Sequence, residues 1–150
     1  MTKAPPMLLC LAAVVPALAA CGGDQGGAAA ARPAAPAPLE ITLEPEYRSG
    51  VTGTARLAPA GAKLKVTLTL DSEVPGILLA HLHAARCRDE LDLKDPRIRA
   101  NLTEVVDGRS ETTLDIVTLE ELRSTHSSIV VHDAANANRP LVCADIPRSA

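Results

Sequence analysis

The chain has 150 residues, with 15 Lys and Arg against 18 Asp and Glu, so its formal net charge is −3. It contains no Phe, no Trp and a single tyrosine, Tyr47, so any core must be built from Val, Leu, Ile and Ala. This composition excludes the basic surface and the aromatic stacking platforms of nucleic-acid-binding proteins, and we expect no nucleic-acid partner.

The first twenty residues have the pattern of a secretory signal peptide. Lys3 precedes an apolar run that begins at Met7, and the run ends in small residues directly before Cys21. A membrane-spanning helix needs about 20 apolar residues, whereas this run is shorter and is interrupted by Pro16. We therefore expect residues 1–20 to be removed, which changes the formal net charge from −3 to −4 because Lys3 is lost.

The segment 18–21 reads Leu-Ala-Ala-Cys and resembles the lipobox of bacterial lipoproteins. The resemblance implies that lipid is attached to Cys21 and that several acyl chains hold the protein stably on a membrane. We expect a cell-envelope lipoprotein that faces the periplasm or the exterior, and the choice of membrane and the oligomeric state stay open. The alternative is an ordinary secretory signal, with Cys21 incidental.

Residues 21–38 comprise this cysteine and a stretch made almost entirely of Gly, Ala and Pro. Such a composition cannot bury a core and is typical of a tether. Residues 39–150 are long enough for one domain with a single core. The chain is therefore divided into a signal peptide (1–20), a lipidated tether (21–38) and a domain (39–150).

In the domain the dominant pattern is alternation of apolar and polar residues, which indicates half-buried strands. Turn signals such as Asp107 and Gly108 separate the segments. Thr118 and Glu121 have the spacing of a capping box and predict a short helix between the sixth and seventh strands. The pattern predicts an all-β antiparallel sandwich or barrel, with eight strands at 39–44, 51–58, 64–70, 77–84, 101–106, 110–117, 128–133 and 141–146.

Four cysteines are present, but export changes what they can do. Cys10 is removed with the signal peptide and Cys21 carries lipid, so the domain keeps Cys87 and Cys143. In an oxidising compartment we expect these two to form a disulfide, worth roughly 4 kcal/mol in the chain-entropy model. Two free thiols are the alternative.

Three histidines lie on predicted strands. Alternation places His81 and His83 on one face and apolar residues on the other, and His132 ends a strand on the side opposite Ile129 and Val131. If these strands are neighbours, three imidazoles converge and leave one coordination position open, as in catalytic metal sites. The alternative is a set of exposed strand histidines without a ligand.

The order His81, His83, Cys87, His132 and Cys143 resembles the pattern of Cu/Zn superoxide dismutases over about residues 49–146. The resemblance implies an eight-stranded Greek-key barrel with the three histidines at copper-ligand positions and with a disulfide between the two cysteines. Copper is also the divalent ion that binds most tightly to an unconstrained nitrogen site.

The sequence departs from that family in two respects. Residues 88–125 contain no histidine, so the zinc site and the bridging histidine are missing and zinc is not expected. The resemblance assigns anion guidance to an arginine three residues before the last cysteine, whereas Arg139 is four residues before it and is followed by Pro140. Arg86 and Arg88 are alternative sources of positive potential.

We therefore expect a copper-binding, superoxide dismutase-like domain, with dismutation of superoxide at a zinc-free site weakened by these losses. The alternatives are a non-catalytic copper-buffering module, a metal-free structural or interaction domain on the same fold, and, least favoured, a three-histidine zinc hydrolase. The fourth histidine, His126, is expected to be an exposed loop residue rather than a further ligand.

Overall fold

The computed structural model describes residues 36–71, 74–90 and 97–149. The predicted signal peptide, the lipidation site Cys21 and the tether up to residue 35 lie outside the described residues. The last three residues of the predicted tether, 36–38, are exposed and belong to no helix or strand. The remaining described residues form the β-domain.

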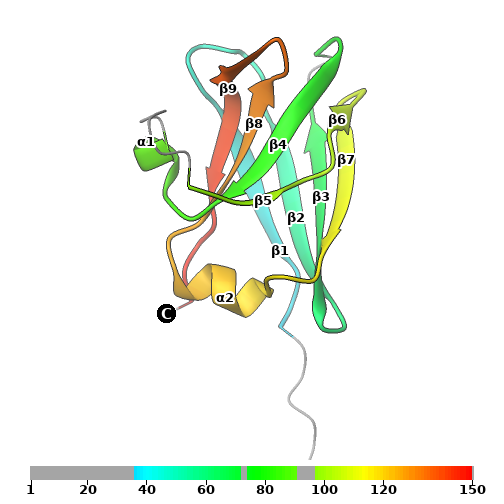
Figure 1. The fold of residues 1–150 in the computed structure, drawn as a ribbon, viewed down its shortest axis with the longest axis vertical. Helices are drawn as coiled ribbons and strands as arrows, with labels where there is room; N and C mark the ends of the chain where they lie inside the picture. Colours follow the sequence, from blue (N-terminus) through cyan, green and yellow to red (C-terminus); the bar gives the residue numbers. More distant parts are fainter. Residues whose placement is uncertain (1–35, 72–73, 91–96, 150) are drawn as a thin grey trace, which may run out of the picture. The chain divides into compact units, whose positions relative to one another are not determined.

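The described residues form nine strands and two short helices (Figure 1). The first four strands precede the first helix. In chain order the elements are β1 (Leu39–Pro45), β2 (Gly53–Ala60), β3 (Lys63–Leu70), β4 (Ile77–His83), α1 (Cys87–Glu90), β5 (Ile98–Asn101), β6 (Val105–Val106), β7 (Arg109–Leu114), α2 (Leu119–Ser124), β8 (Ser128–Asp133) and β9 (Asn136–Asp145).

Eight of the strands close into an antiparallel barrel. Their order is β4–β6–β7–β3–β2–β1–β9–β8, and β8 pairs back with β4. The ninth strand, β5, is additional and pairs with β4. Two connections, from β3 to β4 and from β7 to β8, join strands that are not neighbours in the barrel, which is Greek-key topology. The predicted all-β antiparallel barrel with a short helical turn is confirmed.

Alternation along the strands builds the core, as the sequence predicts. In β3 the apolar residues are buried and the intervening residues are exposed or half-buried. Gly53 lies where β2 approaches β3 most closely, because a Cβ atom there would meet Thr69 O and would lie 2.9 Å from Leu70 Cα. The largest side chains in the core are Leu43, Leu57, Leu64, Leu68, Leu82, Leu122 and Ile129.

Two local predictions are confirmed in atomic detail. Asp107 and Gly108 both have positive φ, +50° and +74°, as a two-residue type I′ hairpin requires between β6 and β7. Thr118 caps α2: its Oγ1 accepts from Glu121 N at 3.2 Å, and its backbone N donates to Glu121 Oε2 at 2.7 Å. The two buried leucines of α2 belong to the core, and α2 lies at one end of the barrel in Figure 1.

The sequence predicts one strand at 101–106, but the structure has two separate strands in this region, β5 and β6. β5 and β6 both pair with β4, and Leu102 N still donates to Ala80 O at 2.9 Å, but Thr103 and Glu104 belong to neither strand. At Thr103 the backbone bonds to side chains instead, because its N donates to Thr112 Oγ1 at 2.7 Å and its carbonyl accepts from Ser110 Oγ at 2.6 Å. These side-chain bonds replace the ladder and break the strand.

β9 begins five residues earlier than predicted, and α1 was not predicted. Proline is disfavoured within a strand, since it has no N–H to donate. In the structure Pro140 pairs with His132 where the register shifts, and at such an irregularity proline is tolerated. α1 has only four residues and is too short for a helical period to be visible in the sequence.

Candidate metal centre

His81 and His83 lie on β4, and His132 lies on β8, the strand paired with it. The residues Leu78, Ala80 and Leu82 point into the core, so the two β4 histidines point to the outer face of the barrel. The pairing brings His132 opposite Leu79, and His81 opposite Val130. His132 is therefore diagonal to His81 across the two strands, within reach of a long side chain.

The three imidazole rings form a tight group. Ring centroids are 5.8 Å apart for His81 and His83, 5.2 Å for His81 and His132, and 6.1 Å for His83 and His132. One nitrogen from each ring can be chosen so that all three lie within 4.8 Å of one another. The predicted convergence of the three histidines is therefore present in the structure.

This donor set fits a transition-metal ion. Two imidazole nitrogens bound to one ion at about 2.0–2.1 Å are at most ~4.2 Å apart, so donors within 4.8 Å need only a small side-chain adjustment. Three protein ligands also leave one position open, as in catalytic rather than structural sites. Among the described residues, no other group of three or more His, Cys, Asp or Glu has this geometry.

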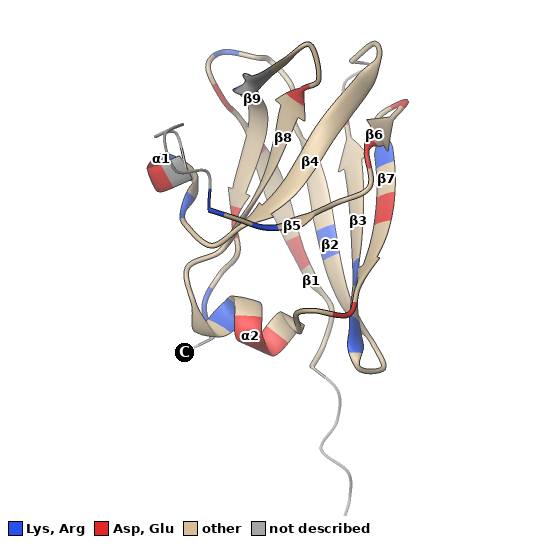
Figure 2. Ribbon diagram, viewed as in Figure 1, with Lys and Arg blue, Asp and Glu red and all other residues tan. Residues whose placement is uncertain are grey.

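The candidate metal site is largely buried, and burial affects the protonation of His81. His83 and His132 are buried, with exposed fractions of 2% and 7%, whereas His81 is half-buried. Burial, and then the neighbouring His83, lower the pKa of His81 below its ordinary value of 6.5. β4 itself carries no charged residue (Figure 2). Neutral imidazole is the form that binds metal, so these effects favour ligation.

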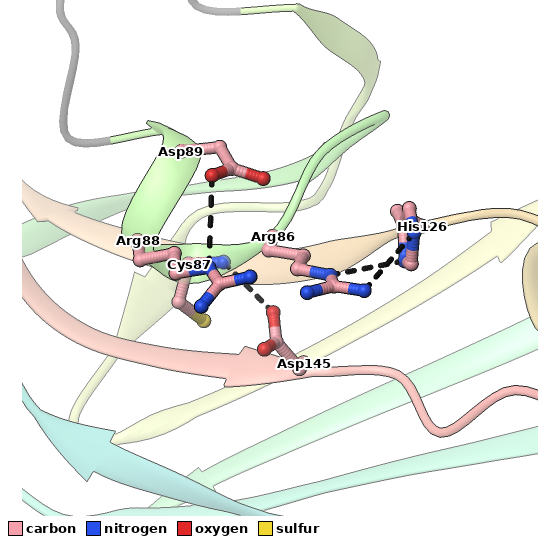
Figure 3. A network of polar contacts seen from close by, with 6 residues as sticks. All are labelled: Arg86, Cys87, Arg88, Asp89, His126 and Asp145. Carbon is pink, nitrogen blue, oxygen red and sulfur yellow. Dashed lines mark hydrogen bonds and ion pairs between the residues drawn. The ribbon is translucent and has the colours of Figure 1, made fainter.

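The predicted disulfide is present and lies one strand away from the histidines. Cys87 bonds to Cys143, whose partner on β8 is Val130, the residue opposite His81. Asp145, two residues further along β9, accepts a hydrogen bond from Cys87 N at 2.7 Å (Figure 3). The disulfide and this hydrogen bond fasten the start of α1 to β9. Asp145 was not singled out in the sequence, although alternation places it on the face of Cys143.

Arg139 lines a pocket that does not include the three histidines. Its guanidinium is 4.0 Å from a carboxylate oxygen of Asp133, and it is half-exposed. Both residues line a pocket with the core-facing Leu78 and with Ser49 to Val51, and none of the three histidines lines this pocket. The structure therefore does not bring Arg139 together with the histidines, and its role in guiding an anion stays a prediction.

The other basic residues near the cysteines have their own partners. The Arg86 guanidinium lies along the edge of His126, with Nε 3.1 Å from Nδ1 and Nη2 3.1 Å from Nε2 (Figure 3). Arg88 is exposed and lies 3.8 Å from the carboxylate of Asp89. His126 is an exposed loop residue outside the three-histidine group, as expected.

A scan against models of known protein families finds no match, and a search of curated proteins likewise finds no similar sequence. Neither helix in the described part of the chain is long and apolar enough to span a membrane. The case for a function therefore depends on the geometry of the histidine site and on the sequence patterns.

Proposed function

We propose that the domain binds one copper ion through His81, His83 and His132, and that it resembles a superoxide dismutase without the zinc site. The observation that carries the proposal is the convergence of three imidazole nitrogens within 4.8 Å on two paired strands. Nitrogen donors without a thiolate or carboxylate suit copper, which heads the affinity order of the divalent ions at such sites. Fold alone would not support this function.

The residues of the chain would contribute rigidity and access. His83 and His132 are buried, and the strand pairing fixes their backbone positions, so the ligands are largely preorganised. His81 is half-buried and is the ligand nearest to solvent. Copper held there would supply one-electron chemistry: it would oxidise one superoxide to O2 and reduce a second, with two protons, to H2O2.

The position of Arg139 favours a second function on the same site. Its guanidinium faces Asp133 in a pocket that none of the three histidines lines. A copper-buffering module needs tight ligands but no anion guidance. Copper storage or buffering is therefore the alternative to catalysis.

A superoxide decay assay on the copper-loaded full chain distinguishes these two functions. For an enzyme we expect decay that is proportional to protein concentration and lost in His81→Ala; a reduction in Arg139→Ala is expected only if Arg139 guides the anion to the site. Arg88→Ala is the matched control because Arg88 is exposed and, among the described residues, forms an ion pair with its neighbour Asp89. A copper-loaded protein whose decay rate equals that of the buffer would overturn catalysis and leave the buffering function.

We also propose that the domain is tethered in the cell envelope through lipid on Cys21. The disulfide supports an oxidising compartment, because such bonds are rare in the cytosol. Mass spectrometry of the protein from bacterial membranes should give a mature chain that begins at Cys21 and carries acyl groups. A Cys21→Ser variant should lose the acylated mass, and an unmodified Cys21 would contradict the proposal.

A further inference from the structure

A second cluster of chemically active side chains lies beyond the histidine site. Arg86 follows β4, His126 and Ser127 precede β8, and Ile146 and Arg148 follow β9. Together with Asp145 these residues line a pocket of about 270 Å³. Because β4 and β9 both pair antiparallel with β8, these segments meet at one end of the three strands.

The Arg86 side chain and the backbone around this pocket are held in place before any ligand binds. Arg86 Nε donates to His126 Nδ1 at 3.1 Å, which orients its guanidinium, and Nη2 lies 3.1 Å from Nε2 (Figure 3). The backbone bond from Ile146 N to Ser127 O, 2.8 Å, joins the chain after β9 to the segment before β8. Preorganised groups lose less entropy when they bind a ligand.

The segment that carries Arg148 is tied down on both sides. Ser149 N donates to Arg123 O at 3.0 Å, and Arg123 Nε donates to Pro147 O at 3.2 Å. These two bonds connect residues 147–149 to α2, so the backbone of Arg148 is fixed at the pocket. Arg148 is exposed and forms no ion pair with a described carboxylate.

The charges in the pocket favour an anion. Two guanidinium groups line it against one carboxylate, that of Asp145, one oxygen of which already accepts from Cys87 N. The contacts of Arg86 with His126 use Nε and Nη2, so they leave Nη1 for a ligand. Paired arginines recognise phosphate and carboxylate through charge-assisted hydrogen bonds.

We propose that Arg86, His126 and Arg148 form a binding site for a phosphate-type oxyanion. The two guanidinium groups bind the oxygens of the anion, and His126 holds Arg86 in position. Both a free phosphate and a phosphomonoester headgroup of a lipid carry this chemistry. The site is independent of the copper proposal, since it shares no residue with the three-histidine group.

Titration of the purified full chain, without added metal, with inorganic phosphate tests the proposal. We expect saturable shifts in the NMR signals of the His126 ring, and about tenfold weaker binding in Arg86→Gln and in Arg148→Gln. Arg88→Gln is the charge-matched control: Arg88 is adjacent in sequence but outside the pocket, so binding should change by less than about twofold.

A second titration with vesicles of phosphatidylcholine, with and without phosphatidic acid, distinguishes the two sources of the oxyanion. Binding of either phosphate or phosphatidic acid vesicles, weakened by Arg86→Gln and not by Arg88→Gln, supports the site and identifies the source. No saturable binding of either probe would overturn the proposal. Equal weakening by all three arginine variants would also overturn it, because that pattern indicates only unspecific charge attraction.

Discussion

The outer faces of β3 and β8 differ although both strands alternate in the same way. On β3 the outward residues Lys65, Thr67 and Thr69 are half-buried, as on an open barrel surface. On β8 the outward residues Ser128, Val130 and His132 are buried, with exposed fractions of 0%, 2% and 7%. The outer face of β8 is therefore covered, and the candidate metal site lies in this second buried layer.

Part of the cover on this face comes from the start of the connection that follows β4, residues 84–90. α1 belongs to that connection, contacts β8 and β9, and is fastened to β9 by the disulfide between Cys87 and Cys143 (Figure 1). The open face has no such bridge. The comparison teaches that an outward histidine becomes a candidate buried ligand where a short helix such as α1 packs over the outer face of the sheet. The predictions that follow test this difference.

Reduction of the disulfide should have the largest effect. The bond closes a loop between residues 56 positions apart, so its loss should lower the free energy of unfolding by about 4 kcal/mol. Urea unfolding of the full chain with and without reductant measures this change. A Cys87→Ala, Cys143→Ala double variant should behave like the reduced protein and should not respond to reductant. Equal unfolding midpoints for the oxidised and reduced wild type would contradict the prediction.

A matched pair of truncations compares the two faces directly. Val130→Ala removes buried methyl groups from the covered face and should destabilise the domain by about 2 kcal/mol. Thr67→Ala removes a side chain of similar size from the open face and should cost about 0.5 kcal/mol or less. Both are measured by urea unfolding. If the two variants lost the same stability, the outer face of β8 would not be a buried layer.

A salt bridge on the open face should contribute little. Lys65 Nζ lies 2.7 Å from Glu111 Oε2, but both side chains are substantially exposed, 40% and 58%. Water and salt screen such pairs, so a double-mutant cycle with Lys65→Met and Glu111→Gln should give a coupling energy of about 0.5 kcal/mol or less. The coupling should decrease further in 1 M salt. A coupling well above 1 kcal/mol would show that this face is less open than its exposure indicates.

The protonation of His81 should make the stability of the domain depend on pH. Its pKa is lowered by burial and by His83, so the unfolded chain binds a proton at higher pH than the folded chain does. The contribution of His81 to stability is therefore fully present above pH 6.5 and is lost as the pH falls through the lowered folded pKa. An NMR titration of the His81 ring in the metal-free full chain should give a midpoint below 6.5. A midpoint at or above 6.5 would contradict this prediction.

Much of this fold was predictable because it follows from local patterns. The alternation in β3, the hairpin at Asp107 and Gly108, and the cap at Thr118 each depend on residues close together in the sequence. The splitting of β5 from β6 was not predictable in this way, because it depends on side chains of β7 that bond to Thr103. Tertiary contacts of this kind leave no periodic signal.

The candidate metal site could be predicted only in part from local sequence patterns. Alternation gives the outward direction of His81 and His83, but it does not show that His83 and His132 are buried. That burial depends on tertiary packing over β8, to which α1 contributes. The separation of Arg139 from the histidines likewise follows from the irregular pairing around Pro140, which the spacing to Cys143 does not reveal.

Copper titration of the full chain tests the central claim most directly. Electron paramagnetic resonance should show one equivalent of Cu(II) with nitrogen ligation in the wild type, and that signal should be lost in His132→Ala. His126→Ala is the matched control, because His126 is the one histidine outside the group and its variant should bind copper as the wild type does. Absence of a stoichiometric signal in the wild type, or an unchanged signal in His132→Ala, would contradict a copper site on β4 and β8.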